Sequence, residues 1–444
     1  RRMMMTNKMS FNILSNCCES PKDHNQLSHL PVAIIGAGPV GLAAAAHLVD
    51  KGEPFYILEA GPQVGHHIQQ WGHVRLFSSW KFNIDHVAKR LLEDNGWKSP
   101  VLTRLPYGKD LIEEYLQPLS QLPEIKPFLH FNSKVVAISK NGLDKMKTAS
   151  RSEQSFVIYV EKEGQTERME ARAVIDATGT WGNPTPINAD HIWTKEEIEL
   201  DQHISYVIPD IKGKDRATYE NKHVVVVGGG HSAINTILEL AALEDVQISW
   251  VLRKNRIQEA YGGEELDALP ARGQLGSRIH QLVDSGRVKV YTPFFIQKVS
   301  RSEDGIQLTG MVRNEEQTII GIDKIISNTG SKPDFSFLRE IRLVLDPATE
   351  SVTKLAPLID PNVHSCGTVR PHGELELRQP EANFYMVGMK SYGRAPTFLM
   401  ATGYEQVRSI VAYITGDEDG AKRVELELPE TGVCSTGIKG KSCC

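Results

Sequence analysis

The sequence is poor in cysteine and lacks the C-x-x-C spacing of a dithiol redox centre. Its six cysteines are Cys17, Cys18, Cys366, Cys434, Cys443 and Cys444. Adjacent pairs in polar ends of a chain do not make a disulfide framework, so we expect a reducing, cytoplasmic compartment. The sequence assigns no role to the five cysteines near the two ends.

Long apolar runs and blocks of one charge are also missing. The longest apolar stretch, about residues 40–49, is too short to span a bilayer, and no continuous apolar core follows Arg1 and Arg2 as in a signal peptide. The net charge is −5 without a block of basic residues, so we expect neither a membrane nor a nucleic acid as partner. The 444 residues are 40% hydrophobic and 24% charged, which is typical of a globular protein with two or three domains.

Residues 31–60 carry the strongest motif in the chain. The apolar run Val32–Ile35 predicts a buried parallel strand, and it is followed by Gly36, Gly38 and Gly41 in G-x-G-x-x-G spacing. These glycines serve a tight turn, the close approach of a pyrophosphate and the packing of a helix on the strand. After an Ala-rich helix and a second strand comes Glu59, 18 residues past Gly41, where an acid accepts ribose hydroxyls. The pattern predicts a βαβ unit that binds a dinucleotide.

A second unit of the same kind begins at residue 223. A valine-rich strand leads into Gly228, Gly230 and Ala233 in G-x-G-x-x-A spacing, followed by a helix over 234–243 and a strand over 248–252. Arg253 lies 20 residues past Ala233, where an NAD site favours an acid and an arginine accommodates the 2′-phosphate of NADP. Lys254 and Arg256 add positive charge. The alternative is that these residues form a solvated basic turn without a ligand. We expect the second unit to bind NADPH rather than NADH.

The two halves share one plan, in which a βαβ unit and an antiparallel meander precede a strand that ends in Thr-Gly. We therefore predict an α/β fold with two Rossmann-like dinucleotide-binding domains, the second inserted in the first. A final helix is expected over 397–414. The expected divisions are a disordered tail over 1–29, a first domain over 30–183, a second over 184–330, the return of the first over 331–418, and a flexible cysteine-containing tail over 419–444.

Two glycine turns, each closed by a Thr-Gly strand end, resemble the two-dinucleotide-binding flavoproteins, which include thioredoxin-reductase-like enzymes and flavin-containing monooxygenases. The resemblance covers about residues 31–414 and implies FAD on the first unit and NADPH on the second. Gly388-Met389 stands where disulfide reductases of this group carry Gly-Asp. Residues 401–404 read Ala-Thr-Gly-Tyr and are similar to the A-T-G-Y of N-hydroxylating relatives, although a chance match inside a helix is equally open.

Site residues follow from the motifs and the resemblance together. The stretch 71–86 is rich in aromatic residues, and its position implies a place around the flavin ring, with core packing and solvated cations as the alternative. Candidates for contact with the reacting groups are Arg75, Trp80, Lys81 and Arg394. The cofactor-binding residues that we expect are Gly36, Gly38, Pro39, Gly41, Glu59, Ala60, Val136, Ala177, Thr178, Gly179, Gly228, Gly230, Ser232, Ala233, Arg253, Lys254, Gly388 and Thr397.

A metal site is not expected. His364, Cys366 and His372 lie close together in the sequence but show no ligand spacing.

The leading functional hypothesis is an NADPH-dependent FAD oxidoreductase of the monooxygenase-like branch, which oxygenates sulfur, nitrogen or a metalloid with molecular oxygen. Such chemistry belongs to the cofactor, which agrees with the lack of a catalytic triad or carboxylate pair. One alternative is a thiol or metalloid reductase that uses the tail cysteines as a shuttle, and another is a flavin-binding redox sensor. The expected partners are a small-molecule substrate, oxygen and a second copy of the chain in a homodimer.

Overall fold

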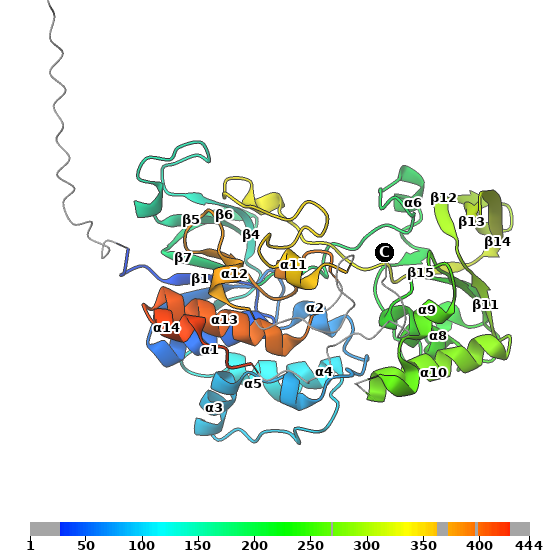
Figure 1. Cartoon of the computed structure of the whole chain (residues 1–444), viewed down its shortest axis with the longest axis horizontal. Coiled ribbons are helices and arrows are strands. Elements are labelled where there is room, and N and C mark those ends of the chain that lie inside the picture. Colours follow the sequence, from blue (N-terminus) through cyan, green and yellow to red (C-terminus); the bar gives the residue numbers. More distant parts are fainter. Residues whose placement is uncertain (1–26, 268–269, 362–371, 396–397, 427–444) are drawn as a thin grey trace, which may run out of the picture.

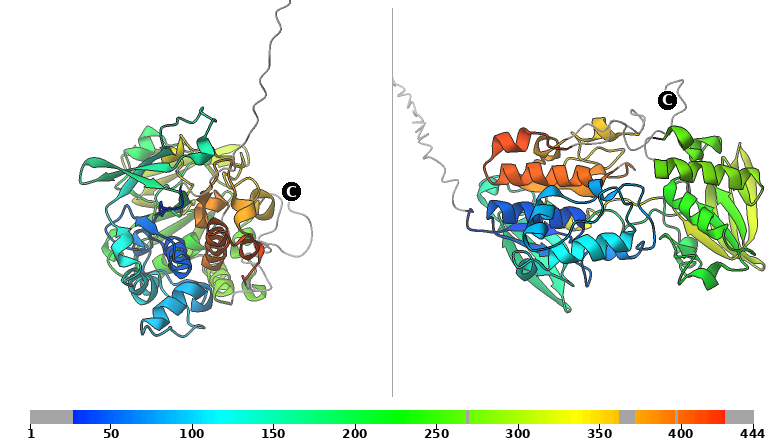
Figure 2. Two further views of the ribbon diagram at one scale, coloured as in Figure 1. Left: turned by 90° about the vertical axis from the view of Figure 1, so that its left-hand side faces the viewer. Right: turned by 90° about the horizontal axis from the view of Figure 1, so that it is seen from below.

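The computed structural model describes residues 27–267, 270–361, 372–395 and 398–426 (Figure 1). These residues form two lobes that lie side by side, each built on a parallel sheet, as Figure 2 also shows. The predicted α/β class with two Rossmann-like units is confirmed. In the described part of the chain, no helix has the length and apolar character needed to cross a membrane.

The sheet of the first lobe has five parallel strands in the order β16-β7-β1-β2-β3. Its central strands are apolar and buried, as expected of a parallel sheet covered on both faces. The strands are β1 (Val32–Ile35), β2 (Phe55–Leu58), β3 (Leu129–His130), β7 (Ala173–Asp176) and β16 (Phe384–Met386). An antiparallel meander joins β3 to β7, with strands β4 (Lys134–Lys140), β5 (Phe156–Lys162) and β6 (Gln165–Ala171).

Two long helices, α1 (Pro39–Lys51) and α13 (Met400–Ile414), pack against each other in this lobe (Figure 1). They approach so closely that a Cβ added to Gly403 would lie 2.5 Å from Cγ2 of Val40. The C-terminal part of the chain therefore completes the core around the first glycine turn.

The sheet of the second lobe also has five parallel strands, in the order β11-β10-β9-β15-β8. They are β8 (Ile204–Ser205), β9 (His223–Val227), β10 (Gln247–Val251), β11 (Val288–Tyr291) and β15 (Lys324–Ser327). Helices α8 (His231–Leu240) and α10 (Pro270–Asp284) belong to this lobe. Its meander consists of β12 (Phe295–Ser302), β13 (Gly305–Val312) and β14 (Glu315–Ile322).

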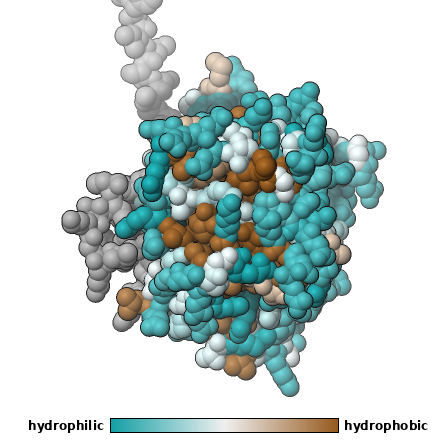
Figure 3. Space-filling model, turned by 90° about the vertical axis from the view of Figure 1, so that its right-hand side faces the viewer, coloured by the Kyte–Doolittle hydropathy of each residue, from teal (hydrophilic) through white to brown (hydrophobic). Residues whose placement is uncertain are grey.

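The outer face of the second lobe is largely polar, with some apolar side chains gathered at its centre (Figure 3). The meander of this lobe exposes Phe295 on β12 and Ile320 on β14. Scattered exposed apolar residues of this kind are ordinary on a protein surface.

Shorter elements connect the sheets and long helices. The α-helices are α2 (His66–Gln69), α3 (His86–Asp94), α4 (Gly108–Asp110), α5 (Gln117–Ser120), α6 (Lys195–Ile198), α7 (Arg216–Tyr219), α9 (Gln258–Tyr261), α11 (Ala356–Ile359), α12 (Glu374–Leu377) and α14 (Glu418–Lys422). The 3₁₀ and π-helical turns are η1 (Trp80–Phe82), η2 (Leu111–Leu116), η3 (Lys126–Phe128), η4 (Arg151–Glu153), η5 (Glu264–Leu266), η6 (Ser336–Leu338) and η7 (Gly388–Tyr392).

The helical segment around residues 110–119 contains a π-helical turn, η2. Pro118 has no N–H group, so it cannot donate to the carbonyl of Glu114. That carbonyl instead accepts a hydrogen bond of 2.8 Å from Nε1 of Trp97. The last long helix begins at Met400 and not at residue 397, because Leu399 is still extended with φ −109° and ψ 145°.

Candidate dinucleotide-binding cavity

One cavity of about 1450 Å³ connects the two glycine turns. Gly38 and Glu59 line it in the first lobe, and Gly230 and Arg253 line it in the second. Strands β1 and β9 both end at this cavity, which is where open α/β sheets bind their ligands. Cavities for single small ligands measure about 300–1000 Å³, so this one has room for more than one ligand.

The first glycine turn has the geometry of a phosphate cradle. Gly36 has φ +101°, and a Cβ on Gly41 would lie 2.0 Å from the carbonyl oxygen of Gly36, so both positions are closed to side chains. By contrast, a Cβ on Gly38 would meet nothing within 4 Å. The open space beside Gly38 lies at the N-terminus of α1, with Pro39 as the first helical residue. Unpaired N–H groups at such a terminus suit a pyrophosphate.

Glu59 is fixed at the end of β2 beside this turn. Its Oε2 accepts a hydrogen bond of 2.8 Å from the Ala37 N–H, and its Oε1 accepts one of 2.7 Å from the Gly61 N–H. Because each carboxylate oxygen retains a lone pair, Glu59 can still accept ribose hydroxyls. Glu59 and the exposed Ala60 both line the cavity, and these residues fit the adenosine half of FAD.

The second glycine turn repeats this arrangement. Gly228 has φ +132°, and a Cβ there would lie 2.2 Å from the carbonyl oxygen of Asn328. A Cβ on Gly230 would meet nothing within 4 Å, so the space beside it is open. Ser232 lines the cavity, while Ala233 is buried in the core of the second lobe. This turn fits the pyrophosphate of a second dinucleotide.

Cations from both lobes gather beside the second glycine turn. Arg253 is exposed, with Nη1 3.2 Å from Nε2 of His191, and Lys254 donates to the carbonyl of Glu259 at 3.0 Å. Burial lowers the pKa of His191, and the positive charges of Arg253, Arg394 and Lys332 lower it further. The lowered pKa favours the uncharged form of His191, and the exposed guanidinium of Arg253 suits an anion such as a 2′-phosphate.

The strand end Ala177-Thr178-Gly179 also lines the cavity, together with Gly388. Thr178 donates its hydroxyl to Asp176 Oδ1 at 2.7 Å, which fixes the turn where the chain leaves the first sheet. Between the lobes, the ring of Phe77 lies 5.5 Å from that of His231, and both rings line the cavity.

The part of the cavity beside this strand end is aromatic and apolar. Trp71 and Trp181 line it with ring centroids 6.4 Å apart, and Nε1 of Trp181 donates to Oε1 of Gln70 at 2.9 Å. Met389 and Phe337 also line the cavity. Stacking surfaces of this kind suit a flat ring system such as a flavin.

Two histidines of this wall, His66 and His67 on α2, are not among the residues that the sequence predicts. Nδ1 of His66 is buried without a hydrogen-bond partner among the described residues, so it is available to a ligand. His67 is partly exposed, and its partial desolvation lowers the pKa of the imidazole; the neighbouring His66 also lowers it, against the carboxylate of Glu59. The adjacent histidines just before the aromatic stretch are the signal that could have identified them.

Six expected site residues do not line the cavity, namely Gly41, Arg75, Trp80, Lys81, Val136 and Ala233. Trp80 is fully buried in the core of the first lobe, with the guanidinium of Arg104 5.6 Å from its ring. Arg75 and Lys81 are exposed on the adjoining segment, and Arg75 forms an isolated bridge with Tyr107. Val136 is the extra residue of a bulge between β4 and β5.

The other candidates near the C-terminus are placed as follows. Arg394 lines the cavity and pairs with Glu350 through an Nε–Oε2 distance of 2.5 Å. Thr397 lies outside the described residues, as do His364 and Cys366. His372 is buried with Nε2 2.9 Å from Nε2 of Gln406.

The Ala-Thr-Gly-Tyr segment has a packing role. Gly403 permits the close contact of α13 with Val40, and Tyr404 donates its hydroxyl to the carbonyl of Asn83 at 2.8 Å. Both contacts join segments of the first lobe, and Tyr404 does not line the cavity.

Comparison with known proteins decides the family. The model of the pyridine nucleotide-disulphide oxidoreductase family matches residues 33–365 and so covers both glycine turns. The chain belongs to this family. As a member it is an FAD-dependent oxidoreductase that uses a nicotinamide dinucleotide, and the expected cofactors FAD and NADP(H) are confirmed.

Curated relatives of this oxidoreductase are named ferredoxin–NADP reductases. The protein from Ligilactobacillus salivarius is 24% identical over 368 residues, which cover 82% of this chain and 88% of the relative. The protein from Lactococcus lactis subsp. cremoris is 26% identical over 305 residues, which cover 68% of this chain and 74% of the relative.

Solved structures with the same fold carry out different reactions. Bacillithiol disulfide reductase from Bacillus cereus has a TM-score of 0.64 at 21% identity, covering 88% of this chain and 99% of its own. The cadaverine monooxygenase of desferrioxamine biosynthesis from Erwinia amylovora, bound to FAD, has a TM-score of 0.62 at 13% identity, covering 93% of this chain and 99% of its own. At these identities the likeness establishes the fold of this oxidoreductase and not its substrate.

Proposed function

We propose that this protein is an NADPH-dependent monooxygenase that uses FAD to transfer one atom of molecular oxygen to a soft nucleophile, namely sulfur, nitrogen or a metalloid. The observation that carries the proposal is the wall of the cavity beside Ala177-Thr178-Gly179. Trp71, Trp181, Phe337 and Met389 make this wall apolar, and no described residue of the cavity is a cysteine. Apolar side chains of this kind would shield a bound flavin from water, which oxygen transfer at a flavin requires, and the described lining offers no thiol for disulfide exchange.

The residues of the cavity divide between two cofactors. Gly36, Gly38, Pro39 and Glu59 would hold the pyrophosphate and ribose of FAD, and Ala177-Thr178-Gly179 with Gly388 would border its flavin end. Gly228, Gly230 and Ser232 would hold the pyrophosphate of NADPH, with Arg253 and Lys254 on its 2′-phosphate. The bound flavin would supply hydride acceptance and oxygen activation.

The protein side chains position and protect the reactants. The two tryptophans would flank the ring system, and the unpartnered Nδ1 of His66 could hydrogen-bond to a bound ligand. Because partial desolvation favours the uncharged form of His67, this imidazole can donate or accept one hydrogen bond without adding charge to the wall. Arg253 and Lys254 would orient NADPH through its 2′-phosphate.

The stoichiometry of the monooxygenase reaction provides a test of the proposal. Each turnover consumes one NADPH, one proton and one O₂, places one oxygen atom in the product and releases the other as water. NADPH oxidation, oxygen uptake and product would be measured with a panel of organic sulfides, primary amines and trivalent metalloids, using ¹⁸O₂ to label the product. We expect equal amounts of all three and labelled product for one of these classes. Undiminished NADPH oxidation without oxygen, coupled to reduction of an added acceptor, would refute the oxygenase assignment.

A reductase is the second candidate, favoured by the ferredoxin–NADP reductases among the relatives and by the fold of the bacillithiol disulfide reductase. If the protein is a reductase, the tail cysteines would pass electrons to a thiol or metalloid substrate. Truncation after Leu428 removes Cys434, Cys443 and Cys444. Loss of turnover in this variant would favour the reductase, and unchanged turnover would exclude a shuttle through these three cysteines.

A further inference from the structure

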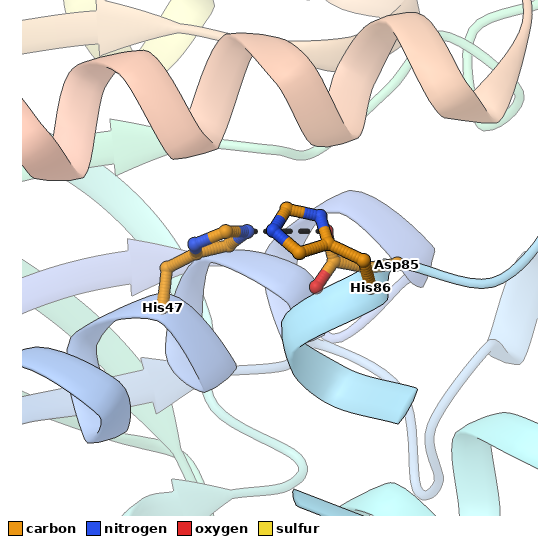
Figure 4. Close-up of side chains that lie close together, drawn as sticks. All are labelled: His47, Asp85 and His86. Atoms are coloured by element: carbon orange, nitrogen blue, oxygen red, sulfur yellow. Dashed lines mark hydrogen bonds and ion pairs between the residues drawn. The ribbon is translucent and has the colours of Figure 1, made fainter. Parts of the chain in front are cut away.

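Three metal-ligating side chains meet between α1 and α3, away from the cavity (Figure 4). His47 lies on α1, Asp85 is the N-cap of α3, and His86 is the first residue of α3. Nε2 of His47 is 3.1 Å from Oδ2 of Asp85, and Nδ1 of His86 is 3.8 Å from the same oxygen. One donor atom from each residue lies within 4.8 Å of the other two. The three side chains thus converge on one point.

The two separations from the Asp85 oxygen are close to those of metal ligands, and the two histidine nitrogens lie within 4.8 Å of each other. In a tetrahedral zinc site with bonds of about 2.0–2.2 Å, neighbouring ligand atoms lie roughly 3.3 Å apart. The observed 3.1 Å and 3.8 Å bracket this value. The side chain of His86 is 61% exposed, so its ring can turn toward the other two ligands.

The Asp85 carboxylate is held so that one oxygen remains for a ligand. Its Oδ1 accepts hydrogen bonds of 3.0 Å and 2.9 Å from the N–H groups of Val87 and Ala88. The backbone N–H of Asp85 donates to the hydroxyl of Tyr115 at 3.1 Å. Outer contacts of this kind fix the orientation of a ligand before the metal binds.

An ordinary hydrogen bond explains only part of the cluster. The 3.1 Å contact accounts for His47 and Asp85, both of which are buried. A separation of 3.8 Å is too long for a hydrogen bond from His86, although its Nδ1 faces the same oxygen. The His86 ring also meets the His47 ring edge to face with centroids 5.5 Å apart, so both imidazoles lie beside the Asp85 carboxylate, where a cation could bind all three donors.

We propose that His47, Asp85 and His86 bind a divalent transition-metal ion, for which two imidazoles and one carboxylate are suited to Zn²⁺, Co²⁺ or Ni²⁺. A water molecule would complete the coordination on the exposed side of His86. The ion would join α1 to α3, and since none of the three residues lines the cavity, its role would be structural. The site is separate from the proposed oxygenase chemistry.

The test measures zinc binding by the full-length, FAD-loaded protein after its cysteines are alkylated with iodoacetamide, because free thiols also bind zinc. Isothermal titration calorimetry and metal analysis after gel filtration would be applied to the unsubstituted protein, His86→Ala, Asp85→Asn and the control His29→Ala. Asp85→Asn keeps a side-chain oxygen for the helix cap, and His29 is an exposed histidine outside the cluster. All four proteins should fold.

We expect one zinc ion per chain in the unsubstituted protein and in His29→Ala, with binding weakened roughly tenfold or more in the other two variants. Crystals soaked in zinc should give an anomalous peak between His47 and His86. Absence of zinc binding, or equal affinity in all four proteins, would overturn the proposal.

Discussion

Nζ of Lys390 lies 2.6 Å from Oδ2 of Asp176, and both side chains are completely buried. Lys390 belongs to η7, just after β16, and Asp176 ends β7. The ammonium group also lies 4.4 Å from the ring centroid of Phe337 and 3.2 Å from the Thr178 hydroxyl. The ion pair therefore joins two strand ends that border the cavity, directly behind Thr178.

Removing one partner of this pair should be costly. Lys390→Met leaves the Asp176 carboxylate buried without its cation, and we expect a loss of about 3–5 kcal/mol in the free energy of unfolding. In the double variant Lys390→Met/Asp176→Asn no buried charge remains, and an amide oxygen can still accept from Thr178. We expect this double variant to recover most of the loss, as measured by urea unfolding. A single variant as stable as the unsubstituted protein would contradict this account of the pair.

The second and third glycines of the first turn, Gly38 and Gly41, should respond differently to substitution. Gly38 is extended, with φ −83° and ψ −174°, and its Cβ position is open, so Gly38→Val should fold but block the pyrophosphate. We expect purified Gly38→Val to have lost most of its FAD absorbance at an unchanged far-ultraviolet circular dichroism spectrum. Gly41→Ala would clash with the Gly36 carbonyl and should instead lower the yield of folded protein. Full FAD content in Gly38→Val would exclude this turn as the FAD site.

Arg253 should determine the preference for NADPH over NADH. A lost charge-assisted contact with the 2′-phosphate costs about 1.5–3 kcal/mol, so Arg253→Ala should raise KM for NADPH roughly tenfold or more and leave KM for NADH nearly unchanged. Arg256→Ala is the matched control, because Arg256 is exposed and does not line the cavity. Equal changes for both dinucleotides would rule out this role.

The lowered pKa of His67 predicts how the stability of the folded protein depends on pH. Partial desolvation lowers the pKa of His67 in the folded protein below its ordinary value of 6.5. Between the lowered pKa and 6.5 the unfolded chain binds more protons, so this group makes the protein less stable as the pH falls through that window. We expect His67→Gln to show a smaller drop in Tm between pH 7.5 and 5.5 than the unsubstituted protein, whereas His29→Gln should behave like the latter. An unchanged drop in His67→Gln would show that this imidazole is not the titrating group.

The parts of the fold that sequence reasoning predicts are those with a local chemical requirement. Gly36, Gly41 and Gly228 stand where the backbone conformation or a neighbouring carbonyl permits no side chain, so their spacing reveals both βαβ units. Buried parallel strands such as Val32–Ile35 are equally clear because they are continuous apolar runs.

What sequence reasoning misses depends on tertiary packing. The aromatic character of the stretch 71–86 does not distinguish Trp71, which lines the cavity, from Trp80, which is buried in the core. Nor does any spacing rule relate His47 to Asp85, which come from different helices and meet only through the packing of α1 on α3. The adjacent histidines His66 and His67 belong to no known motif, and only the structure shows that both line the cavity.

The position of β16 beside β7 has a consequence for how the protein is made on the ribosome. Strand β7 ends at residue 176, but its neighbour β16 begins only at residue 384, after the entire second sheet has been synthesised. Until then the nascent first lobe has an open strand edge and lacks α13, which covers Val40, so it exposes apolar surface while the second lobe can already fold. The second lobe is thus the first to be completed during translation, and chaperone binding to nascent chains should be strongest before residue 414 emerges.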